Sequence, residues 1–313
     1  MDGGLDSPAT GGCLERNLKG HSNRILALGF APNSHLLAST DFDGSVIVWD
    51  VVSGSSTRLV QPMHVPLSVR FSPDQSLLAV GATFPPPDPT QAYGGEVTLW
   101  RTSDWTVVRT LSEYLPRSIV FSADSRYLVV GPGVTGSTST PVGTAFNVWD
   151  LSTGSMRGVG TPEQATNDMA ISRDGRIIVT VGDAIRRWQF DGTLLGTQSS
   201  RQSAGLFHVD ISPDATTIVS GGMLPSQLEL WNAADGSYLK NLPERASASS
   251  VMFVPDSQTL LISSNDDIHT VRITDLNTTH YPSRIGRAII APDGNLVASD
   301  LTDYSIQVWC LRP

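Results

Sequence analysis

The stretch FAPNSHLLASTDFDGSVIVWD, residues 30–50, contains the pattern from which the rest of the chain is built. It opens with a Pro/Asn turn, continues with the apolar run LLAS at 36–39, and ends in the alternating run SVIVWD at 45–50. A short apolar run is typical of a strand buried on both faces, and alternation is typical of a strand with two different faces. The stretch therefore predicts two neighbouring β-strands joined by a tight turn.

The opening turn recurs along the whole chain. Its copies begin at Phe30, Phe71, Phe121, Ile171, Ile211, Phe253 and Ile290. The steps between them are 41, 50, 50, 40, 42 and 37 residues, and a period near 40 indicates one supersecondary unit that buries its apolar faces against its neighbours. An apolar run and an alternating run follow each copy, and Gly or Asp-Gly after several of them signals a further strand. Four strands repeated seven times predict an all-β, seven-bladed β-propeller with four antiparallel strands per blade.

The first repeat resembles the WD-repeat family, and the resemblance extends over residues 14–313. It matches the Gly-His, Ser, Asp and Trp-Asp positions of that family with Gly20-His21, Ser39, Asp43 and Trp49-Asp50. The resemblance implies a structural chain of hydrogen bonds from the histidine through the aspartate to the serine and the indole, which satisfies polar groups inside the propeller. The other repeats depart from the pattern, and Thr274 takes the Trp position of the sixth repeat.

The two ends of the chain are expected to meet in the last blade. The seventh repeat stops soon after Trp309, and residues 14–18 precede the first complete blade with the character of a strand. In the family the N-terminal strand completes the last blade, so that no sheet edge stays unpaired there. We therefore expect a flexible leader at residues 1–12 and a single propeller at residues 13–313.

The chain has two cysteines, Cys13 and Cys310. Counted from the first blade, they fall at positions that face each other across a strand turn, so they can lie at disulfide distance where the ring closes. The alternative, which we favour at this point, is a pair of free thiols in a reducing cytosol.

Composition excludes several classes of function. The formal net charge of −9 and the pI near 5.0 argue against binding to a nucleic-acid backbone. No apolar run approaches the length of a membrane span, about 18 residues, and the N-terminus lacks the pattern of a signal peptide. We expect a cytoplasmic monomer. The sequence has no CxxC or HExxH pattern, so we expect no metal site and no cofactor.

Two repeats are longer than the others and carry long loops between their second and third strands, at residues 82–95 and 132–145. Loops on a rigid scaffold often carry binding residues, and the first of these loops offers Phe84 and Tyr93. Both loops extend the face of the ring that, in the family, holds the mouth of the central channel. The alternative is that the insertions are merely tolerated, because long loops cost little entropy.

Further candidates begin the innermost strands at this channel mouth. The candidate ligand- or partner-binding residues there are Arg24, Arg117, Phe207, Arg284 and Arg287, and His64, two places off the family's histidine position, is either a further candidate or a structural residue. Clustered arginines suggest a pocket for carboxylate or phosphate, although they can equally stack between blades or pair with acids. His208 and Asp168 occupy equivalent positions in neighbouring repeats and are the candidates for acid–base catalysis. The alternative for these two residues is a satisfied structural pair.

Two functions are compatible with these residues. The first is a scaffold that binds a protein or peptide on the loop-extended face and has no chemistry of its own. The second is a small-molecule enzyme or ligand binder, of the lyase, isomerase or cyclase type, that holds an anionic or polar metabolite at the channel mouth. We favour the scaffold, which rests on family analogy.

Overall fold

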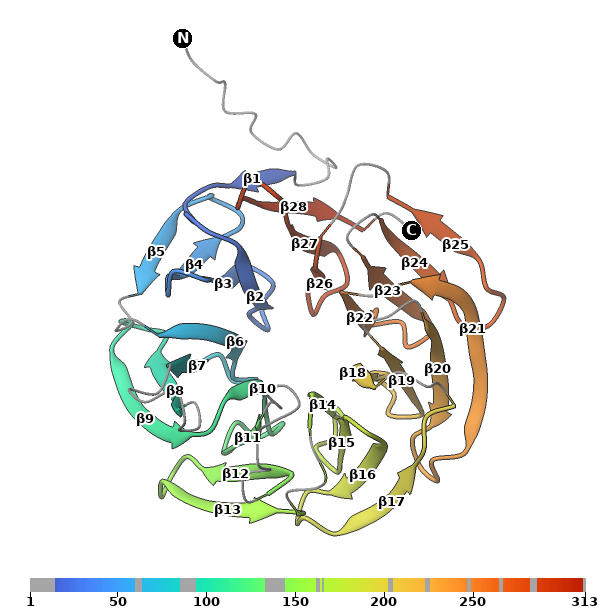
Figure 1. Cartoon of the computed structure of the whole chain (residues 1–313). Helices are drawn as coiled ribbons and strands as arrows, with labels where there is room; N and C mark the ends of the chain where they lie inside the picture. The colour runs from blue at the N-terminus through green and yellow to red at the C-terminus, as the bar shows by residue number, and fades with distance from the viewer. Residues whose placement is uncertain are drawn as a thin grey trace.

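Seven four-stranded antiparallel sheets form a ring in the computed structural model, and the innermost strand of each sheet lies at the centre (Figure 1). The structure describes residues 15–59, 64–84, 94–132, 144–161, 164, 166–201, 205–222, 226–246, 249–264, 267–281 and 286–311. The leader at residues 1–12 lies outside these ranges. The ring confirms the prediction of a seven-bladed β-propeller.

Six blades consist of four consecutive strands each, and the first strand in sequence is the innermost one. Blades 1 and 2 contain β2 (Ile25–Phe30), β3 (Leu36–Asp41), β4 (Val46–Asp50), β5 (Ser56–Leu59), β6 (Val65–Phe71), β7 (Leu77–Phe84), β8 (Gly94–Arg101) and β9 (Val107–Glu113). Blades 3 and 4 contain β10 (Pro116–Phe121), β11 (Tyr127–Pro132), β12 (Phe146–Asp150), β13 (Ser155–Val159), β14 (Asp168–Ile171), β15 (Ile177–Val181), β16 (Ile185–Gln189) and β17 (Leu194–Gln198). Blades 5 and 6 contain β18 (Leu206–Ile211), β19 (Thr217–Gly222), β20 (Ser226–Asn232), β21 (Tyr238–Ala246), β22 (Ser250–Phe253), β23 (Thr259–Ser263), β24 (Ile268–Arg272) and β25 (Thr278–His280).

Blade 7 is built from both ends of the chain. Its strands are β26 (Ala288–Ile290), β27 (Leu296–Asp300), β28 (Ile306–Cys310) and, outermost, β1 (Arg16–Leu18). β1 runs antiparallel to β28, with Arg16 opposite Val308 and Leu18 opposite Ile306. The expected closure by the N-terminal strand is thus confirmed.

Cys310, the last residue of β28, is disulfide-bonded. The sequence contains one other cysteine, Cys13, which lies outside the described residues. Our preference for free thiols is therefore wrong for Cys310. Disulfides are rare in reducing compartments such as the cytosol. The cytoplasmic location therefore stays a prediction, and the disulfide at Cys310 argues against it.

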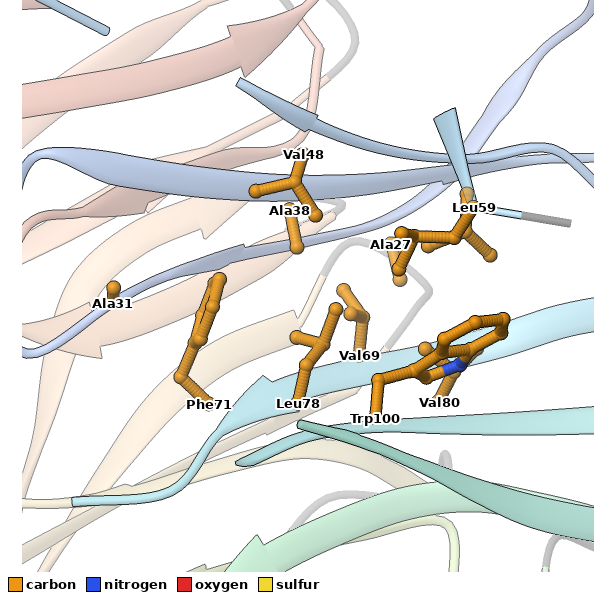
Figure 2. Packing of buried hydrophobic residues seen from close by; sticks show 11 residues of the cluster. Ala27, Ala31, Ala38, Val48, Leu59, Val69, Phe71, Leu78, Val80 and Trp100 are labelled. Carbon is orange, nitrogen blue, oxygen red and sulfur yellow. The ribbon is translucent and has the colours of Figure 1, made fainter. Parts of the chain in front are cut away.

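The blades adhere through apolar side chains that interdigitate between neighbouring sheets. Figure 2 shows this packing between blades 1 and 2, where Ala38 and Val48 of blade 1 face Phe71, Leu78 and Trp100 of blade 2. Alternation places one set of side chains on each face of a strand, so every blade presents one apolar face to each neighbour. Burial of one such Leu, Val or Phe side chain contributes about 1.5–3 kcal/mol.

The strand registers place the tryptophans of the repeats at one equivalent position. Leu37 faces Trp49 in blade 1, and Leu260 faces Val271 at the same place in blade 6. The assignment of Thr274 to this position is therefore wrong. The reason is that β24 ends at Arg272 and the following residues form the turn into β25.

Several of these tryptophans donate their indole N–H to acceptors that differ from blade to blade, whereas Trp100 Nε1 has no hydrogen-bond partner among the described residues. In blade 3, Trp149 Nε1 donates a hydrogen bond of 2.5 Å to Glu113 Oε1, and Asn147 Nδ2 donates one of 2.9 Å to Glu113 Oε2. Burial raises the pKa of Glu113, and these two hydrogen bonds oppose that rise. A glutamate from the end of blade 2 therefore satisfies two donors of blade 3.

Replacing Glu113 with alanine is expected to lower the free energy of unfolding by about 2 kcal/mol, because the Trp149 and Asn147 donors lose their acceptor. Glu113→Gln keeps one acceptor oxygen and is expected to cost about half as much. Urea unfolding monitored by tryptophan fluorescence gives both values. Equal stability of the alanine variant and the wild type would contradict this role of Glu113.

No part of the described chain forms a helix with the length and apolar character needed to cross a bilayer.

Candidate functional site

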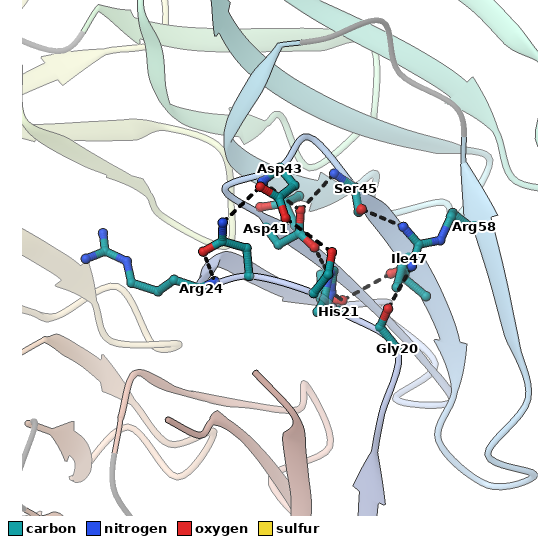
Figure 3. Close-up of polar contacts among 12 residues, drawn as sticks. Gly20, His21, Arg24, Asp41, Asp43, Ser45, Ile47 and Arg58 are labelled. Atoms are coloured by element: carbon teal, nitrogen blue, oxygen red, sulfur yellow. Dashed lines mark hydrogen bonds and ion pairs between the residues drawn. The ribbon is translucent and has the colours of Figure 1, made fainter. Parts of the chain in front are cut away.

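The hydrogen-bonded polar chain of blade 1 connects the segment before β2 with strands β3 and β4 (Figure 3). His21 Nδ1 lies 2.7 Å from Asp41 Oδ2, and His21 Nε2 lies 2.6 Å from Ser39 Oγ. The indole N–H of Trp49 donates to the same Ser39 Oγ at 2.7 Å. Burial lowers the pKa of His21, while the hydrogen bond to Asp41 opposes that shift. The chain is therefore present, and Asp41 is its carboxylate.

Asp43 does not occupy the position that the sequence assigned to it. Asp43 lies in the turn after β3, where it accepts hydrogen bonds from Ser22 Oγ at 3.2 Å and Asn23 Nδ2 at 2.9 Å. Asp41 ends the strand and is fully buried, so its carboxylate reaches both the imidazole and the turn. The correction moves the structural role of Asp43 to Asp41, two residues earlier.

A belt of side-chain hydrogen bonds joins neighbouring blades along their innermost strands. Arg70 Nη1 reaches Leu28 O at 3.3 Å, Ser68 Oγ reaches Pro116 O at 2.8 Å, and Ser118 Oγ reaches Asp168 Oδ1 at 3.0 Å. The belt continues with Val209 N to Asp168 Oδ2 at 3.2 Å, Phe253 N to Asp210 Oδ2 at 2.7 Å, and Ser250 Oγ to Ala288 O at 2.7 Å. The guanidinium of Arg287 donates to Leu26 O and links blade 7 to blade 1. Every junction of the ring thus has a polar tie at its centre.

This belt bears on the proposed acid–base pair. Asp168 begins β14 and His208 lies at the equivalent place in β18, and both side chains are half-buried. Both carboxylate oxygens of Asp168 accept hydrogen bonds from the neighbouring blades, through Ser118 Oγ and Val209 N. Phe207, beside His208, is also half-buried. A structural role explains these contacts of Asp168, and catalysis by the pair stays a prediction.

Three of the predicted arginines gather at the channel mouth. Burial lowers the pKa of Arg287, Asp300 opposes the shift, and the positive charges of Arg24 and Arg117 lower it further. Arg24 and Arg117 are exposed, and neither guanidinium is hydrogen-bonded to another described residue. Figure 3 shows the side chain of Arg24 extending away from its blade. Arg284 lies outside the described residues.

A second layer of charge lies deeper in the channel. Arg70 is exposed toward the channel. The protein around its guanidinium still removes part of the solvent, and this desolvation lowers its pKa. Burial raises the pKa of Asp210 to about 7, the charge of Asp168 adds to the rise, and Arg70 opposes it. Burial also raises the pKa of Asp300 at the mouth. Four guanidinium groups therefore face three carboxyl groups, of which two are reluctant to ionise.

Aromatic side chains flank this cationic mouth over blades 7, 1 and 2. Phe84, at the end of β7, packs on the His64 ring with centroids 4.7 Å apart, and His64 Nδ1 lies 3.2 Å from Glu96 Oε1. Phe42 is 56% exposed and Tyr304 is 41% exposed, and both lie in turns between the second and third strands of their blades. The backbone N–H of Phe42 donates to Arg24 O at 3.0 Å. We call Phe42, Phe84 and Tyr304 the aromatic rim.

Sequence reasoning found Phe84 and missed the other two rim residues. The available signal was an aromatic residue inside the turns DFDG at 41–44 and TDYS at 302–305, where polar or glycine residues are the usual choice. The long loops leave blades 2 and 3 on this same face, between β7 and β8 and between β11 and β12. Their central parts, including Tyr93, lie outside the described residues.

Comparison with known proteins gives a family match for the first repeat. The family described as "WD domain, G-beta repeat" matches residues 12–50. Protein tipD of Dictyostelium discoideum is 24% identical over 306 residues, which make up 93% of this chain and 40% of that protein. Autophagy-related protein 16 of Arabidopsis thaliana is 25% identical over 236 residues, or 69% of this chain and 43% of that protein.

A shorter match links the chain to a protein named for the repeat. WD repeat-containing protein VIP3 of Arabidopsis thaliana is 30% identical over 105 residues, or 33% of this chain and 29% of that protein. The matched region is less than half the length of each of these relatives. The match at residues 12–50, the polar chain of blade 1 and the closed ring agree: the chain is a seven-bladed β-propeller with degenerate repeats, and its first repeat matches the WD-repeat family.

Proposed function

We propose that this propeller is a protein-interaction scaffold that binds an acidic, extended segment of a partner across the channel mouth on the loop-extended face. Propellers of this family generally bind protein partners. The observation that carries the choice of face is the pair of exposed guanidinium groups of Arg24 and Arg117, which have no hydrogen-bond partner among the described residues.

The chemistry of the mouth favours a carboxylate-bearing partner. A guanidinium offers a planar fork of donors that matches a carboxylate with two parallel hydrogen bonds. The protein as a whole has a formal net charge of −9, so the cationic mouth is a local exception to its surface. An acidic segment that approaches elsewhere meets repulsion, and this charge pattern selects the mouth.

The aromatic rim supplies the second element of such a surface. Phe42 and Tyr304 expose ring area on the same face as Arg24, and aromatic and arginine side chains are the residue types that most often dominate binding energy in interfaces. A peptide that places carboxylates on Arg24 and Arg117 and an apolar side chain against the rim would use both elements. The enzyme alternative lacks comparable support, because the contacts of Asp168 are explained by its inter-blade ties.

The double variant Arg24→Ala/Arg117→Ala is expected to weaken binding of a fluorescent oligoglutamate peptide by about 30-fold or more, since loss of an anchoring arginine typically costs at least about 2 kcal/mol. Fluorescence anisotropy at two salt concentrations measures the effect, and binding of the wild type should weaken at the higher concentration.

The matched control removes two exposed arginines from the opposite face, Arg173→Ala/Arg176→Ala, which gives the same change of net charge. This control is expected to bind the peptide as well as the wild type or better. If both double variants lose binding equally, the attraction is general electrostatics and the proposed face is wrong. If the Arg24/Arg117 variant keeps full affinity, the proposal fails.

A further inference from the structure

Two histidines and an aspartate come together on blade 6, away from the channel. His269 in β24 and His280 in β25 are a cross-strand pair, and Asp267 directly precedes β24. His269 Nδ1 lies 2.9 Å from Asp267 Oδ2, and His280 Nδ1 lies 2.8 Å from the same oxygen. The imidazole centroids are 5.2 Å apart, with ring planes inclined by 37°. Three side chains of metal-binding type thus converge on one point.

We propose that Asp267, His269 and His280 form a binding site for a divalent transition metal, with Zn²⁺ as the ion that fits it best. Nitrogen ligands from imidazole with one carboxylate oxygen are a ligand set that Zn²⁺ accepts, and three protein ligands leave one position open. The three candidate ligand atoms all lie within 4.8 Å of one another.

The two N···O separations of the cluster are close to those that Zn²⁺ requires. With metal–ligand distances of about 2.0–2.2 Å, tetrahedral geometry places ligand atoms roughly 3.4 Å apart. The two N···O distances of 2.8 and 2.9 Å are shorter than this, so the cluster has to open by only a few tenths of an ångström on those sides. His280 is 63% exposed at its side chain and can make this adjustment without disturbing the core.

The burial of the ligands differs in a way that suits a rigid site. The His269 side chain is 7% exposed and is held by a strand of the blade, so it provides a fixed ligand. Asp267 is 34% exposed and His280 is more exposed still, so the ion reaches the site from solvent and keeps its open position on that side. Binding replaces the protons that link both Nδ1 atoms to Asp267, because a coordinating imidazole must offer a lone pair.

The site escapes sequence reasoning because its ligands are assembled by strand pairing. Asp267 and His269 are two residues apart, but His280 joins them only through the register that places it opposite His269. No motif with fixed spacing records such a pair, so the earlier expectation of no metal rested on local motifs alone.

Titration of the untagged, chelator-treated protein with ZnCl₂ tests the proposal by isothermal calorimetry and native mass spectrometry. The wild type is expected to bind one Zn²⁺ at this site. His280→Ala and Asp267→Asn should each weaken that binding by more than about 100-fold, since even changes to residues behind a metal ligand cost 10–100-fold. His35→Ala removes an exposed histidine from blade 1 and should leave Zn²⁺ binding unchanged.

Cobalt substitution gives an independent signature. Co²⁺ in the wild type is expected to show the intense visible absorption of a four-coordinate ion, and His280→Ala should abolish it. Circular dichroism and the melting temperature without metal establish that the variants fold. Zn²⁺ binding that survives both ligand variants, or no binding by the wild type at micromolar Zn²⁺, would overturn the proposal and leave a hydrogen-bonded His–Asp–His cluster.

Discussion

The variant Asp41→Ala is expected to lose about 3–5 kcal/mol of unfolding free energy, whereas Asp43→Ala is expected to lose less than about 1 kcal/mol. Asp41 is fully buried, and its Oδ2 pairs with His21 Nδ1. Its Oδ1 accepts hydrogen bonds from the backbone N–H groups of Asp43 and Ser45 at 3.1 and 2.9 Å. Alanine leaves three polar groups of the blade without an acceptor. Asp43 makes only exposed contacts with Ser22 and Asn23.

Urea denaturation of the two variants beside the wild type measures this difference. The Asp43 variant is the matched control, because it removes the same side chain from the same turn. Asp41→Asn keeps one acceptor oxygen and should fall between the wild type and the alanine variant. If Asp43→Ala proves the more damaging of the two, the hydrogen-bonded chain of blade 1 has been assigned to the wrong carboxylate.

The second large effect concerns Asp210, whose pKa burial raises to about 7 from the ordinary 3.8. A carboxyl with a raised pKa in the folded state contributes stability that is fully present below pH 3.8 and is lost as the pH rises through 7. The shift corresponds to an upper limit of about 4 kcal/mol, which water in the channel reduces. The groups that face it are Asp168, which favours the protonated form, and Arg70, which opposes it.

Comparison of the wild type with Asp210→Asn isolates this contribution. The variant is expected to lose a hydrogen bond at every pH, because its amide cannot accept from both Phe253 N and Ile211 N. Between pH 4 and pH 8 the stability of the wild type should decrease relative to that of the variant. Asp191→Asn is the control: hydrogen bonds from Thr193 lower the pKa of this exposed carboxyl, so its difference from the wild type should stay flat above pH 5. A parallel pH profile for Asp210→Asn would show that Asp210 is ionised throughout.

The fold could be predicted because the information that determines it is repeated. The turn phrase, the apolar run and the alternating run return seven times, so an error in one copy is corrected by the others. The error at Thr274 illustrates what repetition does not supply. Where blade 6 lacks tryptophan, local sequence cannot reveal that β24 ends at Arg272, because the end of the strand is set by its pairing with β23.

The roles of site residues were harder to predict than their positions. Arg24, Arg117 and Arg287 lie at the mouth, as expected, but the Arg287 guanidinium donates to Leu26 O, while those of the other two make no hydrogen bond to a described residue. Tertiary contacts determine which of several equivalent arginines uses its N–H groups for hydrogen bonds within the protein. The same holds for Asp41 and Asp43, which are equally plausible carboxylates in the sequence but differ in burial and in hydrogen-bond partners.

The pairing of β1 with β28 has a consequence for how the molecule is made. Among the strands of the ring, β1 is synthesised first and its partner β28 last, so the blade cannot be completed during synthesis of the earlier repeats. The first six blades can stack as they emerge, because each contacts its sequence neighbours. The final step pairs residues at opposite ends of the ring's sequence. This pairing has the largest sequence separation in the propeller, so it is the slowest to form. Moving the chain ends to a turn between two blades by circular permutation would remove this delay and keep the ring.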